Sequence, residues 1–231
     1  MNNENRPHKQ ILDEPLTLEK INADIHNRID NINKEFTEGF NFIKTQSKSV
    51  TFFGSARTLE TEQEYQDARE LAKRISTELG YSVFTGGGPG IMEAANRGAF
   101  ENSGKSFGLT IKLPAEQVTN PYLTDHINFN YFFSRKVCMS YSAEAYVYFP
   151  GGFGTFDELF EILTLVQTNK IERVPVILIG SEFWRPFDDF LRSTLLKEEK
   201  IKEEDLALYT ITDNLDEALE IIKKAPVRIA D

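Results

Sequence analysis

Hydrophobic side chains recur every three or four residues near the start of the chain, before the pattern changes to short apolar blocks. The recurring positions are Leu18, Ile21, Ile25, Ile29, Ile32, Phe36, Phe40 and Ile43. This spacing predicts an amphipathic helix with one apolar face. Because such a face needs a cover, we expect the helix to pack on its own domain or on a partner subunit, or to serve as a regulatory or partner-docking arm.

From residue 49 onward, short apolar segments alternate with longer stretches of helical periodicity. The expected strands cover residues 50–53, 82–85, 107–112, 127–131, 145–149, 174–179 and 208–212. The expected helices cover residues 62–79, 90–102, 133–143, 155–170, 184–196 and 215–224. This alternation predicts an α/β fold, a doubly wound, mostly parallel sheet with helices on both faces. We expect an N-terminal polar segment and helix over residues 1–48, and one α/β domain over residues 49–231.

Charge and composition narrow the classes of partner. Among 231 residues, 26 Lys and Arg face 36 Asp and Glu, a formal net charge of −10. This balance disfavours nucleic acid and anionic membranes as partners but leaves room for a local pocket that binds one small anion. The single cysteine, Cys138, excludes a disulfide within the chain and is expected to be a buried, inert thiol. Residues 1–15 are polar and no stretch approaches the roughly 20 apolar residues of a membrane span, so we expect a cytoplasmic protein.

Three of the expected strands end in loops that suit a ligand, because ligands of doubly wound sheets bind outside the carboxyl ends of the strands. The first loop, Gly54-Ser55-Ala56-Arg57, offers backbone amides, a hydroxyl and a guanidinium. A plain surface turn explains these residues equally well.

The second loop passes from a strand through four glycines into a helix. Its residues are Thr85, Gly86, Gly87, Gly88, Pro89, Gly90, Ile91, Met92 and Glu93. Glycines allow a ligand to approach the backbone closely, and a helix N-terminus suits phosphate. The loop lacks the Lys-Ser/Thr pair of a Walker A loop and the G-x-G-x-x-G spacing of a dinucleotide site. A purely structural tight turn is the alternative interpretation.

The third loop, Pro150-Gly151-Gly152-Phe153-Gly154-Thr155, again joins an apolar strand to a helix. Two such loops in one sheet indicate an anionic ligand held between helix N-termini, with Thr155 donating its hydroxyl to a phosphate. Glu158 allows two interpretations. It can form a capping box with Thr155, or it can bind ribose hydroxyls or activate water beside the phosphate loop.

Charged side chains near these loops are further candidates. Arg135 and Lys136 stand in an otherwise apolar run upstream of the third loop. The planar, permanently charged guanidinium suits phosphate or carboxylate recognition, whereas a charge pair on a helix surface is the alternative. Glu93 can contact a ribose or a base, although a carboxylate in the first turn of a helix is favourable without any ligand.

The segments GGGPGIMEAANRGA and PGGFGTFDE, with Ser134-Arg135-Lys136 upstream of the second, resemble the LONELY GUY (LOG) family, formerly labelled lysine decarboxylases. The similarity covers roughly residues 49–196. It implies a Rossmann-like homodimer, or an assembly of dimers, that hydrolyses the N-glycosidic bond of a nucleoside 5′-monophosphate. The expected substrates are AMP and cytokinin riboside 5′-monophosphates, and the products are a free base and ribose 5-phosphate. Pro89, Glu93 and the N-terminal helix are similar to a longer bacterial branch of the family.

The resemblance also assigns roles to individual residues. It implies that Arg135 and Glu158 are the catalytic pair. Together with the loops above, it predicts phosphate or substrate contacts at Gly54, Ser55, Gly86, Gly87, Gly88, Met92, Glu93, Lys136, Gly151, Gly152, Gly154 and Thr155. It implies no cofactor, and the chain's three histidines (His8, His26 and His126) are not in the spacing of metal ligands.

Three other functions are weighed against this one. A non-catalytic carrier or sensor of a nucleotide or of molybdenum cofactor can use the same fold and phosphate loops. A pyridoxal-phosphate decarboxylase needs a Schiff-base lysine, and no lysine follows either glycine loop in a suitable position. A dinucleotide oxidoreductase needs the glycine fingerprint that this chain lacks.

Overall fold

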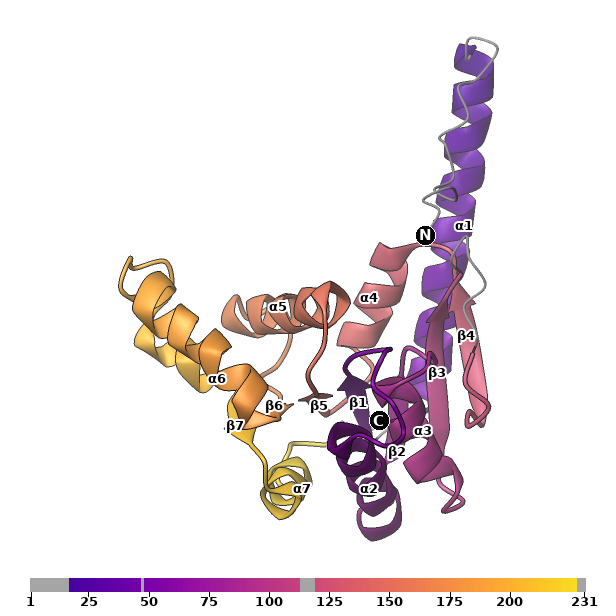
Figure 1. The fold of residues 1–231 in the computed structure, drawn as a ribbon. Coiled ribbons are helices and arrows are strands. Elements are labelled where there is room, and N and C mark those ends of the chain that lie inside the picture. The colour runs from indigo at the N-terminus through magenta and orange to yellow at the C-terminus, as the bar shows by residue number, and fades with distance from the viewer. Residues whose placement is uncertain (1–16, 47, 113–118, 228–231) are drawn as a thin grey trace, which may run out of the picture.

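A seven-stranded parallel sheet forms the centre of the computed structural model, which describes residues 17–46, 48–112 and 119–227 (Figure 1). The strands are β1 (Ser49–Phe53), β2 (Ser82–Thr85), β3 (Ser106–Ile111), β4 (Asp125–Phe129), β5 (Ala145–Tyr148), β6 (Val176–Ile179) and β7 (Thr210–Thr212). They lie in the order β4-β3-β2-β1-β5-β6-β7, and every neighbouring pair is parallel. The chain moves from β1 toward β4 and then returns to the other side of β1 at β5. The carboxyl ends of β1 and β5 therefore flank the topological switch point, where ligands of such sheets bind.

Helices cover both faces of the sheet, which confirms the predicted doubly wound α/β class (Figure 1). One face carries α2 (Gln63–Glu78), α3 (Ile91–Phe100) and α7 (Leu215–Lys223), and the other carries α1 (Leu18–Lys44), α4 (Phe132–Ser140), α5 (Phe153–Gln167) and α6 (Ser181–Phe190). Successive side chains of a strand point to opposite faces, so Phe52 joins the core under α2 and α3 while Phe53 joins the core under α4 and α5. No helix of the described residues is long and apolar enough to cross a membrane.

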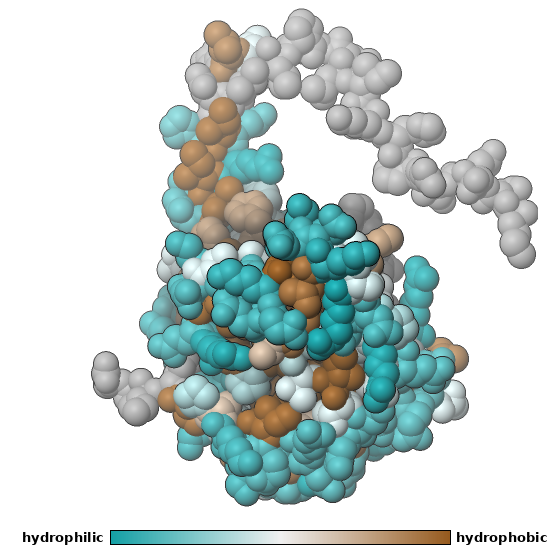
Figure 2. Space-filling model, turned by 90° about the vertical axis from the view of Figure 1, so that its left-hand side faces the viewer, coloured by the Kyte–Doolittle hydropathy of each residue, from teal (hydrophilic) through white to brown (hydrophobic). Residues whose placement is uncertain are grey.

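The long helix α1 packs on its own domain near its C-terminal end and extends away from it at the other (Figure 1). Ile43 is buried in the core. Ile25 and Ile29 are 47% and 50% exposed, and they belong to a stripe of apolar side chains along the projecting part of the helix (Figure 2). Residues 1–16 of the predicted N-terminal segment, including His8, lie outside the described residues.

Close contact between α1 and α4 depends on a glycine. A Cβ atom at Gly39 would lie 2.5 Å from the Cys138 sulfur and 3.0 Å from the Phe129 ring, so only glycine lets the two helices approach this closely. Cys138 is buried in this contact, as predicted, and burial raises the pKa of its thiol to about 12. The thiol therefore stays protonated and unreactive at neutral pH.

Several predicted boundaries differ from the observed ones. The strand predicted over residues 127–131 lies two residues earlier in the structure, because β4 runs from Asp125 to Phe129. The next two backbone N–H groups, those of Asn130 and Tyr131, donate to the Glu35 carboxylate of α1 and not to a neighbouring strand. The helix expected over residues 184–196 consists of α6 followed by a π-helical turn at Leu191–Leu196, and a 3₁₀ turn covers Glu203–Ala207.

Candidate active site

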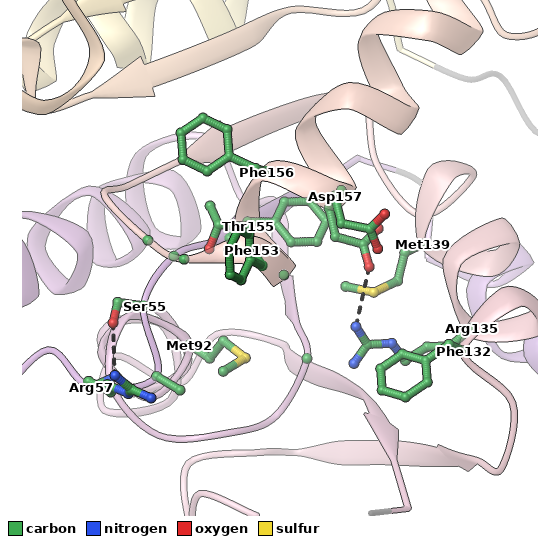
Figure 3. Close-up of a pocket in the computed structure, with 18 residues that line it drawn as sticks. Ser55, Arg57, Met92, Phe132, Arg135, Met139, Phe153, Thr155, Phe156 and Asp157 are labelled. Atoms are coloured by element: carbon green, nitrogen blue, oxygen red, sulfur yellow. Dashed lines mark hydrogen bonds and ion pairs between the residues drawn. The ribbon is translucent and has the colours of Figure 1, made fainter. Parts of the chain in front are cut away.

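A cavity of about 700 Å³ lies at the carboxyl ends of β1, β2 and β5, beside the switch point (Figure 3). Its walls come from the loops that follow these strands, from α4 and from the first turns of α3 and α5. The cavity is lined by most of the predicted site residues, namely Gly54, Ser55, Gly86, Met92, Arg135, Gly151, Gly152, Gly154, Thr155 and Glu158. Residues from all three glycine-containing loops are therefore brought together, as the positions of the strand ends predict.

Arg135 and Glu158 form an ion pair inside the cavity. Arg135 lies on α4 and Glu158 on α5, and the arginine Nη2 donates to the glutamate Oε1 at 3.3 Å. The two side chains are only 13% and 8% exposed. The guanidinium carbon lies 5.9 Å from the centre of the Phe132 ring, which covers it from the side (Figure 3). The pair predicted from the sequence is thus assembled across two helices.

The Glu158 carboxylate is electrostatically unusual. Burial raises its pKa above the ordinary value of a glutamate; the cations of Arg135 and Lys136 oppose the rise, and the Glu161 carboxylate adds to it. A carboxylate with a raised pKa beside a fixed cation, in a cavity at the switch point, is a candidate for proton transfer or for stabilising positive charge.

Glu158 does not act as a helix cap. The helix α5 begins at Phe153, with Gly152 as its N-cap residue and no side-chain capping bond. Thr155 is therefore already in the third helical position, and the Thr155 and Glu158 side chains cannot form the capping box that the spacing allowed. The structure thus excludes the capping interpretation of Glu158, whose carboxylate instead accepts a hydrogen bond from Arg135.

The start of α5 borders open space in the cavity. A Cβ atom at Gly152 or Gly154 would meet nothing within 4 Å, so there is free space above the first turn of the helix. The first backbone N–H groups of a helix have no intrahelical partner and attract anions. Gly151 has the opposite surroundings, because a Cβ atom there would lie 2.1 Å from the Thr155 hydroxyl oxygen. Gly151 therefore shapes the loop, whereas Gly152 and Gly154 leave room for a ligand.

The backbone of Ser55 holds the three loops together. Its N–H donates to the carbonyl of Pro150 at 2.9 Å, and its carbonyl accepts from the N–H of Ile91 at 3.0 Å. Its hydroxyl accepts from the N–H of Arg57 at 3.0 Å (Figure 3). These bonds connect the end of β1 to the third loop and to the start of α3, which makes the floor of the cavity a single hydrogen-bonded unit.

Four predicted contact residues do not line the cavity in the described part of the chain. Gly87 and Gly88 are structural: Gly87 has a φ of +72° that favours glycine, and the carbonyl of Gly88 accepts from Asn120. Glu93 accepts a hydrogen bond from the Tyr65 hydroxyl at 3.0 Å, in line with the ligand-free alternative.

Lys136 is the fourth of these residues, and it connects α4 to α5. Its ammonium lies 2.8 Å from an Asp157 carboxylate oxygen and 2.7 Å from one of Glu161. Although burial opposes the effect, these two bonds raise the pKa of Lys136. Lys136 therefore holds the two helices that carry the Arg135 and Glu158 pair, and it supplies positive charge near Glu158.

Several other residues line the cavity. Ala56, Arg57 and Phe153 belong to the candidate loops but were not among the predicted contacts. The residues that sequence reasoning missed are Phe53, Phe132, Met139, Phe156 and Asp157. Helical spacing was the available signal for two of them, because positions three before and four after Arg135 share its face of α4. No comparable signal marks Phe153, whose side chain is 97% exposed at the start of α5.

Comparisons with known proteins agree on the family. The family model described as "Possible lysine decarboxylase" matches residues 92–222, a range that contains both Arg135 and Glu158. The pyrimidine/purine nucleotide 5′-monophosphate nucleosidase of Escherichia coli (strain K12) is 30% identical over 142 residues, which cover 54% of this chain and 31% of that protein. The cytokinin riboside 5′-monophosphate phosphoribohydrolase LOG of Oryza sativa subsp. japonica is 32% identical over 131 residues, which cover 55% of this chain and 53% of that protein.

A solved structure shares the fold. The molybdenum cofactor carrier protein of Chlamydomonas reinhardtii matches with a TM-score of 0.57 at 23% identity, covering 78% of this chain and 98% of that one. At this identity the match shows the architecture alone. The chain spans about a third of the E. coli nucleosidase and about half of the rice enzyme.

Proposed function

The chain belongs to the family described as possible lysine decarboxylases, which includes the LOG proteins, and from this premise we propose that it hydrolyses the N-glycosidic bond of a nucleoside 5′-monophosphate. The products are a free base and ribose 5-phosphate. The observation that carries the proposal is the buried Arg135 and Glu158 ion pair, which lies in a cavity beside the open N-terminus of α5. An anion site and a carboxylate within one cavity are what this reaction requires.

The start of α5 suits the 5′-phosphate. Free space lies above Gly152 and Gly154, Thr155 lines the cavity, and the N-terminus of a helix attracts anions. A phosphate held there places the ribose toward Glu158, one helical turn farther along α5. The ligand is thereby oriented with its sugar ring beside the carboxylate.

Glu158 supplies the chemistry at the sugar. Cleavage of the C–N bond develops positive charge on the ribose ring, and a carboxylate beside the ring stabilises that charge. Glu158 also accepts a proton from the attacking water, whose oxygen forms the new bond to the anomeric carbon. The base departs with the bonding electrons and takes up a proton from a solvent water, and Glu158 returns its own proton to solvent. Arg135 holds the carboxylate in place and keeps it ionised, because its cation lowers the pKa that burial raises.

The older decarboxylase label does not fit the site. A pyridoxal-phosphate enzyme needs a lysine amine free to form a Schiff base. Among the described residues that line the cavity there is no lysine, and the neighbouring Lys136 is bound to Asp157 and Glu161. Its raised pKa is the opposite of what a nucleophilic amine requires.

We also propose that the protein forms a homodimer. Phe153, Phe132, Phe133 and Phe160 are 97%, 56%, 45% and 44% exposed on α4 and α5. Exposed aromatic side chains grouped beside a ligand cavity are typical of a surface that another protein covers. A symmetric copy of the same face is the simplest cover.

The activity is tested by incubating the protein with AMP and, separately, with isopentenyladenosine monophosphate, and by chromatography of the products. We expect free base and ribose 5-phosphate in equal amounts from at least one of the two nucleotides. Tight binding of both nucleotides without release of base would contradict hydrolysis and favour the carrier function.

The pH dependence of turnover tests the ionised form of Glu158. Because the mechanism needs the carboxylate, kcat/KM falls as pH drops through the pKa of Glu158, which burial raises. Lys136→Met removes a cation that lowers this pKa, so the acid limb of the profile moves to higher pH. Glu161→Gln removes a carboxylate that raises it, so the limb moves to lower pH. Profiles of kcat/KM that shift in the same direction in both variants would exclude Glu158 as the titrating group.

A further inference from the structure

The catalytic helix α4 lacks a cap of its own. Its N-cap residue, Tyr131, makes no side-chain capping bond. The first turn of this helix nevertheless carries Phe132 and Arg135, both of which line the cavity. A helix end without a cap frays, and fraying here would displace the arginine that binds Glu158.

A carboxylate from the N-terminal helix binds the two residues that lead into α4 and one side chain of its first turn. One oxygen of Glu35 accepts from the backbone N–H and from the side-chain amide of Asn130, both at 2.7 Å. The other oxygen accepts from the N–H of Tyr131 at 3.4 Å and from the hydroxyl of Ser134. Glu35 is 5% exposed, so these donors replace the water that the carboxylate has lost.

The charge and position of Glu35 match a capping role. A carboxylate is favourable at the N-terminus of a helix, where the dipole is positive. Burial alone would raise the pKa of Glu35, but the hydrogen bonds from Ser134, Asn130 and Tyr131 outweigh burial and lower it. The group is therefore ionised at neutral pH. Close packing at Gly39, one helical turn farther along α1, keeps the two helices in contact.

From these contacts we propose that Glu35 is a positioning residue of the reaction, because it fixes the first turn of α4 and thereby sets the place of Arg135 against Glu158. Ser134, which donates to Glu35, directly precedes Arg135 in the chain. The N-terminal helix is then part of the machinery that orders the site, although none of its described residues lines the cavity. This inference rests on the proposed function.

The test compares Glu35→Gln with Glu38→Gln in the full-length protein. Glu38 lies on the same helix, but its ion pair with Lys34 is on the surface, with side chains 54% and 69% exposed. We expect Glu35→Gln to lower kcat by roughly tenfold or more with little change in KM, because the phosphate site on α5 is untouched. Hydrogen exchange in residues 130–140 should become faster, while exchange in α2 stays the same. Glu38→Gln should leave all of these unchanged.

Unchanged kcat and exchange in a folded Glu35→Gln protein would overturn the proposal. If that variant fails to fold, Ser134→Ala removes a single donor to Glu35 and should show the same changes in smaller degree. Hydrogen exchange is measured without nucleotide. If the original protein cleaves no nucleotide, the proposed function fails, while faster exchange in α4 still supports Glu35 as the residue that positions Arg135. Equal rates of hydrogen exchange in α4 of the original protein and of the variant would reject the positioning role of Glu35.

Discussion

Replacing Glu158 with glutamine is expected to abolish most turnover while leaving the protein folded. The amide keeps the shape of the side chain but neither accepts a proton from water nor carries the negative charge that stabilises the ribose cation. Loss of a positioned general base lowers rates by about 10²- to 10⁴-fold. We expect kcat to fall within this range in the Glu158→Gln protein, measured by release of free base.

The stability half of this prediction follows from the sign of the pKa shift. The folded-state pKa of Glu158 is raised, so the folded protein holds this proton more tightly than the unfolded chain does. Ionised Glu158 therefore destabilises the fold, and this cost appears as pH rises through the unfolded pKa and is complete above the folded one. A neutral glutamine removes this cost but leaves the buried Arg135 cation without its charged partner, and the two effects oppose each other. We therefore expect the variant to stay folded, with a thermal unfolding temperature close to that of the original protein.

A matched control is Glu182→Gln. Glu182 lies on another helix, α6, where it is exposed and does not line the cavity. Its variant should keep full turnover. A folded Glu158→Gln protein that still releases base at the original rate would remove Glu158 from the mechanism.

Elements of the fold were predicted correctly where burial alone determines the pattern of apolar residues. Strand β2 begins and ends at the predicted residues, 82 and 85, because both of its faces are covered and its side chains form a continuous buried run. Prediction failed where a distant side chain intervenes. The end of β4 depends on Glu35, which is 95 residues away from Asn130 in the chain. No local pattern contains that contact.

The site shows the same division. The residue pattern raised Arg135 and Glu158 as separate candidates, the family resemblance implied that they form a pair, and the topology places them together. Spacing could not tell that Lys136, the next residue, faces Asp157 and Glu161 and not the ligand cavity. Adjacent residues of a helix point about 100° apart, so Arg135 and Lys136 were unlike each other in direction and only one of them was to be expected at the ligand. The Thr155 and Glu158 capping box failed for a related reason, because α5 begins two residues earlier than expected.

Replacing Arg135 should cost as much activity as replacing Glu158, through a different physical effect. Arg135 is the strongest of the influences that lower the pKa of Glu158. In Arg135→Ala the buried Glu158 carboxylate loses its partner, so its pKa rises further. A larger fraction of Glu158 is then protonated and inactive at neutral pH. A charge left unpaired in the interior is costly, and proton uptake is the usual way of avoiding that cost. We expect kcat to fall by at least about 10²-fold at neutral pH.

Raising the pH separates the two effects of this substitution. If Arg135 acted on the ionisation of Glu158 alone, Arg135→Ala would recover full activity at a pH high enough to ionise the carboxylate. We expect only partial recovery, because the guanidinium also fixes the carboxylate at 3.3 Å from its own nitrogen and packs beside Phe132. Arg135→Lys keeps the charge without the planar fork, so it should retain the acid limb of the profile but turn over more slowly. Full activity of Arg135→Ala at every pH would show that Glu158 works without its partner.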